Sequence, residues 1–174
     1  DIPLEVLLFA VGGDNSITHS VMQAREDLSH AGLVTLDAHF DLRDGISNGS
    51  PVRRLVEAGL DPRRIVQVGI NDFSNSVEYA HRASELGITV ISRSVVAEFG
   101  IRAAMDRALE VAASAGGGVY VDLDVDVCDR SVVPACPAAA PGGLSAFELR
   151  QAARMAGGHP AVRTIDATEV DATI

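Results

Sequence analysis

Short apolar runs alternate with segments of helical spacing along the 174-residue chain, and this alternation constrains the fold more than any other feature. The apolar runs predict strands at residues 6–11, 33–41, 65–68, 88–91, 119–126 and 162–168. The segments between them predict helices at residues 14–29, 51–59, 75–86, 95–113 and 145–158. Such alternation is typical of a parallel α/β sheet, so we predict a single α/β domain over residues 1–174.

The strand at residues 119–126, with the sequence VYVDLDVD, turns acidic at its end. Because side chains alternate along a strand, Asp122, Asp124 and Asp126 are predicted to lie on one face. Three adjacent carboxylates resist ionising together unless a cation neutralises them. The pattern therefore predicts half of a metal site, the alternative being a strand end where the acids are simply hydrated.

A second strand end, at residues 33–41, carries an imidazole between two acids. The same alternation places Asp37, His39 and Asp41 on one face. Oxygen and nitrogen ligands together suit manganese, iron or zinc better than calcium or magnesium, and several carboxylates suggest two ions. A lone His beside an Asp is more often a surface pair, but the second acidic strand end favours the metal site.

Composition limits the partners of the chain. Hydrophobic residues make up 47% and charged residues 22%, which is an ordinary globular composition. The net charge of -10 disfavours nucleic acid and anionic membranes as partners. Two cysteines and no N-terminal signal pattern indicate a reducing cytoplasm. The abrupt start at Asp1 and the stop at Ile174, directly after a predicted strand, suggest a chain truncated at both ends.

Further polar residues are predicted at the same edge of the sheet as the two acidic strand ends. The continuous apolar run at residues 6–11 predicts a strand buried on both faces. Asp14 and Asn15 follow it, at the start of a helix that Ser16 or Asp14 can cap. The last strand delivers Glu169 to this edge, where open parallel sheets bind their ligands.

Two loops at this edge contain residues of possible chemical interest. The loop at residues 42–50 holds Arg43 and Asn48, and loops in such positions commonly carry specificity. The Pro-rich loop at residues 132–143 contains Cys136. We interpret Cys136 as an inert small residue rather than a nucleophile, because no His is predicted beside it.

Five motifs, taken in order, resemble the ureohydrolase family of arginases and agmatinases. They are GGDNSIT at 12–18, DAHFD at 37–41, DVDVCD at 124–129, PGGLS at 141–145 and EVD at 169–171. Each alone is weak, but five in order are highly specific, and the likeness covers essentially the whole chain. It implies a three-layer α/β sandwich with a mostly parallel sheet and a binuclear manganese site. It also implies that family members are longer than this chain and that the protein forms homotrimers or homohexamers.

The resemblance also implies roles for individual side chains. Asp37 and Asp124 would bridge two manganese ions, Asp41 would bind one ion, and His39 and Asp126 would bind the other. Asp122 falls where the family has a small polar residue, so we expect it to support the site from behind rather than to bind metal.

Two residues depart from the family pattern. Asn15 stands where arginases and agmatinases have a His ligand, and it can offer only a neutral carbonyl oxygen to one ion. Asn48 stands where they have a loop His, and it cannot carry protons near neutral pH. These departures suggest either a catalytically silent homologue or a different substrate.

Four further motifs are GGDN at 12–15, DLRDG at 41–45, SNGSP at 47–51 and PACP at 134–137. Together they resemble the formimidoylglutamase branch, which hydrolyses N-formimidoyl-L-glutamate to glutamate and formamide in histidine degradation. Arg43 suits a substrate with two carboxylates, because a guanidinium binds a carboxylate through two parallel hydrogen bonds. We expect Glu169 to pair with the cationic formimidoyl group, Asp126 to carry the proton, and Arg43 and Asn48 to bind substrate. The alternatives are an agmatinase or guanidinobutyrase, which release urea, and the silent homologue.

Overall fold

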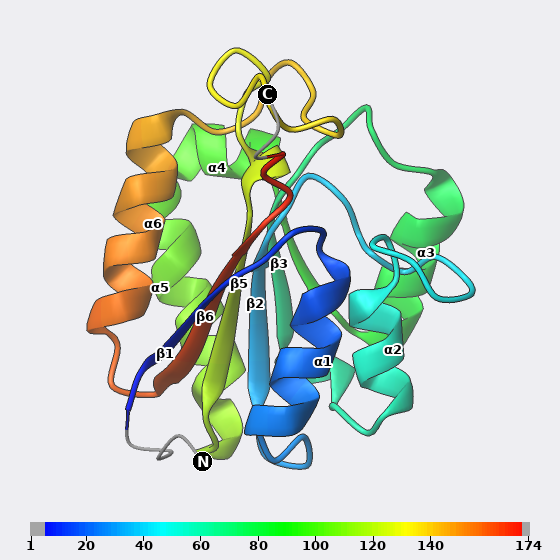
Figure 1. Ribbon diagram of the computed structural model, residues 1–174, viewed down its shortest axis with the longest axis vertical. Coiled ribbons are helices and arrows are strands. Elements are labelled where there is room, and N and C mark those ends of the chain that lie inside the picture. The colour runs from blue at the N-terminus through cyan, green and yellow to red at the C-terminus, as the bar shows by residue number, and fades with distance from the viewer. Residues whose placement is uncertain (1–5, 172–174) are drawn as a thin grey trace.

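A computed structural model describes residues 6–171 and contains one six-stranded sheet (Figure 1). The order of the strands is β1-β6-β5-β2-β3-β4, and all five neighbouring pairs are parallel, so the predicted mostly parallel sheet is entirely parallel. The strands are β1 (Leu8–Val11), β2 (Gly32–Leu36), β3 (Ile65–Ile70), β4 (Thr89–Ser92), β5 (Val119–Asp124) and β6 (Val162–Thr168). The terminal residues Asp1 and Ile174, on which the expected truncation was based, lie outside the described residues.

Helices cover both faces of the sheet, which gives the predicted three layers (Figure 1). One face is covered by α1 (Ser16–Arg25), α2 (Pro51–Glu57) and α3 (Val77–Leu86). The other is covered by α4 (Arg93–Phe99), α5 (Ile101–Ala112) and α6 (Ala146–Gly158). Short 3-10 turns η1 (Pro62–Arg64), η2 (Ala113–Ala115) and η3 (Val125–Val127) complete the described elements. Each face of the sheet has its own apolar core.

Local sequence signals explain several helix ends. The hydroxyl of Ser145 accepts a hydrogen bond from the Glu148 backbone N–H, and Glu148 binds back to the Ser145 backbone, which confirms the capping box predicted for α6. Pro51 occupies the first turn of α2, where a missing N–H costs nothing. Gly87 ends α3 in a left-handed conformation, which glycine adopts without a steric penalty.

Two predicted elements are present, but the burial predicted for one and the continuity predicted for the other were wrong. The strand predicted to be buried on both faces is β1, which lies at the sheet edge and leaves Phe9 and Val11 56% and 77% exposed. The single helix predicted over residues 95–113 is two helices, because Gly100, with a φ of 85°, ends α4 before α5 begins. The apolar spacing continues through this break, so the pattern concealed it.

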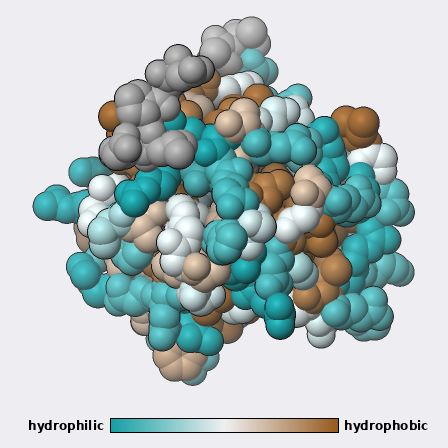
Figure 2. All heavy atoms as spheres, turned by 90° about the horizontal axis from the view of Figure 1, so that it is seen from below, coloured by the Kyte–Doolittle hydropathy of each residue, from teal (hydrophilic) through white to brown (hydrophobic). Residues whose placement is uncertain are grey.

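The three central strands β6, β5 and β2 end side by side at one edge of the sheet, because they are parallel neighbours. This edge carries the predicted site. The opposite end of the molecule, at the amino ends of the strands, is mainly hydrophilic with smaller apolar patches (Figure 2). Within residues 6–171, no helix has the length and apolar character needed to cross a membrane.

Candidate metal centre

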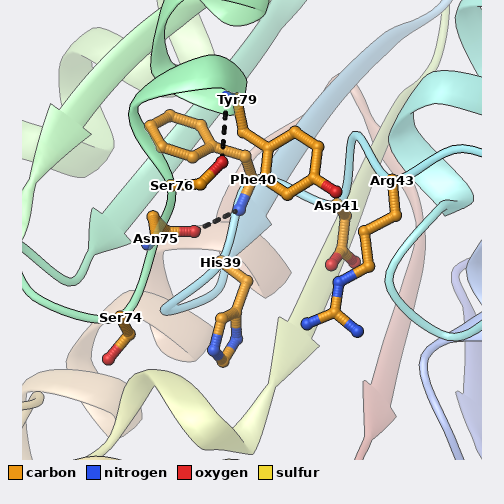
Figure 3. A pocket seen from close by; sticks show the side chains of 8 residues that line it. All are labelled: His39, Phe40, Asp41, Arg43, Ser74, Asn75, Ser76 and Tyr79. Carbon is orange, nitrogen blue, oxygen red and sulfur yellow. Dashed lines mark hydrogen bonds between the residues drawn. The ribbon is translucent and has the colours of Figure 1, made fainter.

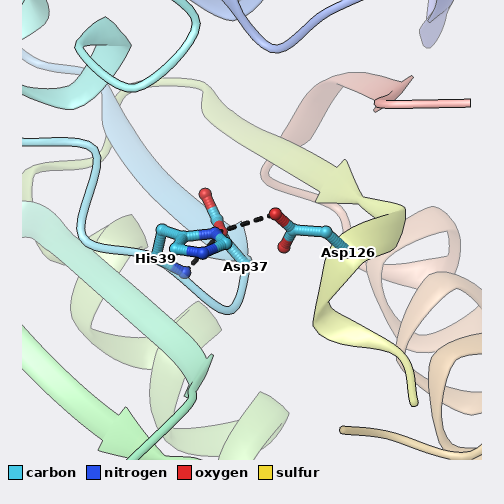
Figure 4. Close-up of side chains that lie close together, drawn as sticks. All are labelled: Asp37, His39 and Asp126. Atoms are coloured by element: carbon cyan, nitrogen blue, oxygen red, sulfur yellow. Dashed lines mark hydrogen bonds and ion pairs between the residues drawn. The ribbon is translucent and has the colours of Figure 1, made fainter. Parts of the chain in front are cut away.

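Three predicted ligands converge at the carboxyl ends of β2 and β5 (Figure 4). The Nδ1 atom of His39 lies 2.8 Å from Oδ2 of Asp126 and 3.4 Å from Oδ1 of Asp37. Potential donor atoms of the three residues all lie within 4.8 Å of one another. Asp37 and Asp126 are buried and His39 is partly exposed, so the cluster opens to solvent on the imidazole side.

Alternation along extended strands was predicted to bring Asp37, His39 and Asp126 together, but none of the three lies on an extended strand. Strand β2 ends at Leu36, and the chain then bends so that the backbone N–H of Ala38 donates to Oδ1 of Asp126, at 3.0 Å. Asp126 lies in the 3-10 turn η3, and its backbone N–H donates to Oδ1 of Asp124 at 2.8 Å. The side chains still meet, because turns at the ends of two adjacent parallel strands point them toward one another.

Asp41 and Asn15 extend the cluster. Asp41 has a φ of 52°, a left-handed conformation that is uncommon for a non-glycine residue, although Asp adopts it more readily than most, and that recurs at functional sites. The side-chain Nδ2 of Asn15 donates to Oδ2 of Asp41 at 2.6 Å and lies 3.4 Å from Oδ2 of Asp37. Asn15 is the residue that precedes α1, but its side chain makes no capping bond to the helix. Of the two capping residues predicted, Ser16 is the first residue of the helix, whereas Oδ1 of Asp14 accepts a hydrogen bond from the Ser16 backbone N–H at 2.9 Å.

The electrostatics of the cluster favour a cation. Burial raises the pKa of Asp37, Asp41 and Asp124 well above the usual range, and the charges of neighbouring carboxylates raise it further. A hydrogen bond with Asp126, together with one to Asp37, raises the pKa of His39 to about 11. A divalent cation among these groups would relieve the repulsion. Carboxylate oxygens with one imidazole nitrogen fit an ion such as manganese.

A cavity of about 130 Å³ adjoins the cluster and is lined by seven of the predicted residues, namely His39, Asp41, Arg43, Asn48, Asp124, Asp126 and Glu169. Glu169 also has a strained φ, of 64°. Its Oε1 accepts hydrogen bonds from the backbone N–H of Asn15, at 2.8 Å, and from Nδ2 of Asn48, at 3.1 Å. Two residues 121 positions apart, Asn48 and Glu169, thus meet at the rim of the site.

A second cavity, of about 290 Å³, lies beside the first and shares His39, Asp41 and Arg43 with it (Figure 3). Its far wall comes from the segment after β3, with Ser74, Asn75, Ser76 and Tyr79. These four residues were not predicted as part of the site. The available signal was their position after a strand of the parallel sheet, where loops reach the ligand edge.

Arg43 is held in place by its backbone. Its N–H donates to the Gly49 carbonyl at 3.0 Å, and its carbonyl accepts from Nε of Arg53 at 2.6 Å. A Cβ atom at Gly49 would lie 2.7 Å from Cδ of Arg43, so glycine leaves room for this side chain. Among the described residues, the guanidinium of Arg43 has no hydrogen-bond or ion-pair partner.

Asp122 is not part of this cluster. It lies one step deeper on β5, fully buried beside Asp166 of β6, and neither of its carboxylate oxygens has a hydrogen-bond partner among the described residues. Cys136 is buried as well, and burial raises the pKa of its thiol to about 11, which agrees with its interpretation as an inert residue.

The fold and the cluster together define an α/β protein with a candidate cation site at the carboxyl ends of its central strands. The family model described as "Arginase family" matches residues 4–174. The chain therefore belongs to the arginase family, as the motifs predicted.

The chain is similar to two formimidoylglutamases. The formimidoylglutamase of Bacillus subtilis is 34% identical over 170 residues, covering 94% of this chain and 53% of that protein. Its crystal structure superposes with a TM-score of 0.87 at 32% identity, with the same coverage of both chains. A formiminoglutamase of Trypanosoma cruzi, solved with Mn²⁺, superposes with a TM-score of 0.85 at 25% identity, covering 94% and 57% of the two chains.

Relatives that act on other substrates also match. The guanidinopropionase of Pseudomonas aeruginosa is 34% identical over 155 residues, covering 85% of this chain and 48% of that protein. The chain thus spans about half the length of the curated relatives it matches.

Proposed function

We propose that the protein is a manganese-dependent hydrolase of a linear amidine, and that its substrate is N-formimidoyl-L-glutamate. The observation that carries the choice of substrate is the Arg43 guanidinium, which lacks a partner among the described residues and borders both cavities next to the metal ligands. An unpaired guanidinium binds a carboxylate through two parallel hydrogen bonds. An agmatine tail, which is cationic, would be repelled there.

Bound manganese would lower the pKa of a water molecule and so supply the nucleophile. The residues that would hold the metal are Asp37, His39, Asp41, Asp124, Asp126 and, through its carbonyl oxygen, Asn15. The water oxygen forms a bond to the formimidoyl carbon, and the bond between this carbon and the glutamate nitrogen breaks. Formamide and glutamate are the products, and a proton moves from the water to the departing nitrogen.

The chain supplies groups for each remaining step. Burial favours a raised pKa for Asp126, but its hydrogen bonds with His39 and Ala38 bring the pKa below the usual value. This carboxylate is therefore ionised, and as a weak base it relays the proton to the departing nitrogen rather than keeping it. Glu169, held by Asn15 and Asn48, pairs with the cationic formimidoyl group. Arg43 and Asn48 bind and orient the two carboxylates.

A second candidate is a guanidino-acid hydrolase that releases urea. The match to a guanidinopropionase favours it, and such a substrate also has a carboxylate for Arg43. The third candidate is a silent homologue, which the replacement of two family histidines by Asn15 and Asn48 favours. The retention of every acidic candidate ligand argues against it, because neutral drift would remove some of them.

A substrate panel separates these candidates. The intact, manganese-loaded protein is offered N-formimidoyl-L-glutamate, guanidinobutyrate, guanidinopropionate, arginine and agmatine, and formamide and urea are measured separately. Selective release of formamide and glutamate supports the proposal. Release of urea from a guanidino acid replaces the substrate but keeps the metal chemistry, and no turnover with manganese bound favours the silent homologue.

A further inference from the structure

A single buried hydroxyl lies between the predicted metal ligand Asn15 and a buried carboxylate. The Oγ1 atom of Thr18 is 2.9 Å from Oδ1 of Asn15 and 2.8 Å from Oδ2 of Asp166. All three side chains are buried. Since a hydroxyl carries one hydrogen, Thr18 can donate to only one of these two oxygens.

Asp166 competes strongly for that hydrogen. Its Oδ2 also accepts from the hydroxyl of Tyr120 at 2.6 Å, while its Oδ1 has no partner among the described residues. Burial raises the pKa of Asp166, whereas the hydrogen bonds from Tyr120 and Thr18 lower it by favouring the ionised carboxylate. In that ionised form, the hydrogen bond from Thr18 is about twice as strong as one to a neutral amide oxygen. When Thr18 donates to Asp166, a lone pair of Oγ1 faces Asn15. This lone pair can accept a hydrogen bond only from the NH₂ group of the Asn15 amide, not from its carbonyl oxygen.

The amide of Asn15 can satisfy its surroundings in two orientations. As the structure has it, Nδ2 faces Asp41 and Asp37, and Oδ1 faces the hydroxyls of Thr18 and, at 3.3 Å, Thr168. Exchanging the two ends of the amide moves no other atom. It turns Oδ1 toward the carboxylates, which is favourable only when a cation lies among them, and it turns Nδ2 toward the two hydroxyl oxygens.

We propose that Thr18, oriented by Asp166, is a positioning residue that holds the carbonyl oxygen of Asn15 toward the cation. The inference rests on the proposed metal function and deepens it. This arrangement explains how the neutral amide of Asn15 can bind a metal ion at a position where a His ligand is expected. The lone pair of the Thr18 hydroxyl favours the amide orientation in which the carbonyl oxygen faces the cation.

The test is a double-variant cycle in the intact protein, read by calorimetric titration of Mn²⁺ alone. Thr18→Val removes the hydroxyl at nearly constant volume, and Thr18→Ser keeps it. We expect Thr18→Val to weaken one of two manganese sites at least tenfold and Thr18→Ser to stay within threefold of the natural protein. Asn15→Asp presents oxygen at both ends, so Thr18→Val should change manganese affinity less than threefold in that background.

Several results would overturn the inference. Equal losses in the Asn15 and Asn15→Asp backgrounds, or equal losses for Thr18→Val and Thr18→Ser, would mean that Thr18 only fills space. If Thr18→Val does not fold, Asp166→Asn takes its place. The new amide can donate to Thr18 and turn the Thr18 hydrogen toward Asn15, so the same site should weaken. A natural protein that binds no manganese would instead refute the proposed metal function itself.

Discussion

The side-chain nitrogen of Asn15 lies 2.6 Å from a carboxylate oxygen of Asp41, so an amide stands where arginases and agmatinases have an imidazole ligand. Asn15 therefore adjoins the acidic cluster, but with a weaker donor than His.

The first prediction follows from this contact. Asn15→His should raise the affinity of one manganese site by at least about tenfold, since outer contacts to a ligand alone change affinity by roughly 10–100-fold. Calorimetric titration of Mn²⁺ measures the change, with Gln23→His, on the exposed surface of α1, as the control. An unchanged affinity in Asn15→His would mean that position 15 does not reach the ion.

The second prediction concerns Arg43. Arg43→Gln should raise KM for N-formimidoyl-L-glutamate about 10–100-fold, because a hydrogen bond to a charged group contributes roughly 1.5–3 kcal/mol. Manganese content should not change. Arg43→Lys, which keeps the charge but loses the planar fork, should recover only part of the loss. Arg107→Gln, on the surface of α5 and paired with Glu110, is the matched control. Equal kinetics for Arg43→Gln and Arg107→Gln would show that Arg43 is a surface charge.

The third prediction concerns stability and pH at Asp61, away from the site. Hydrogen bonds from the side chain and the backbone N–H of Arg63 lower the pKa of Asp61 to about 2. Because the folded-state pKa is below the ordinary value of 3.8, the stabilisation is complete above that pH and is lost as the pH falls toward about 2.

Asp61→Asn should therefore lower the free energy of unfolding by roughly 0.5–1 kcal/mol at pH 7, a small value because the pair is largely solvated, and by almost nothing at pH 2. Urea unfolding at the two pH values measures the difference. Asp106→Asn, an exposed acid on α5 with no hydrogen-bond or ion-pair partner among residues 6–171, is the control. A loss for Asp61→Asn that is the same at both pH values would contradict the assigned role.

The sequence predicted the sheet and the location of the site because both depend on short-range patterns. Apolar runs mark the strands, and the acids that follow residues 36 and 123 must reach one edge once the strands are parallel. The local geometry was not predictable in this way. Asp126 lies in a 3-10 turn rather than on a strand, and Asp41 has a left-handed backbone; neither leaves a periodic signal.

Long-range contacts could not be predicted from the sequence either. The bond from Thr18 to Asp166 joins residues 148 positions apart and depends on how α1 packs over β6. The exposure of β1 depends on its place at the sheet edge, which its apolar sequence does not reveal. Gly100 ends a helix because of its φ, although the apolar spacing around it continues.

The most direct test of the account is the manganese content of the intact protein after chelation, reloading and removal of free metal. We predict two ions per chain in the natural protein, and loss of both ions together with activity in Asp124→Ala, because the proposed role of that carboxylate is to bind both ions. Thermal unfolding should shift upward on reloading in the natural protein but not in Asp124→Ala. Retention of two manganese ions and normal turnover by Asp124→Ala, or no manganese in the natural protein, would contradict the account.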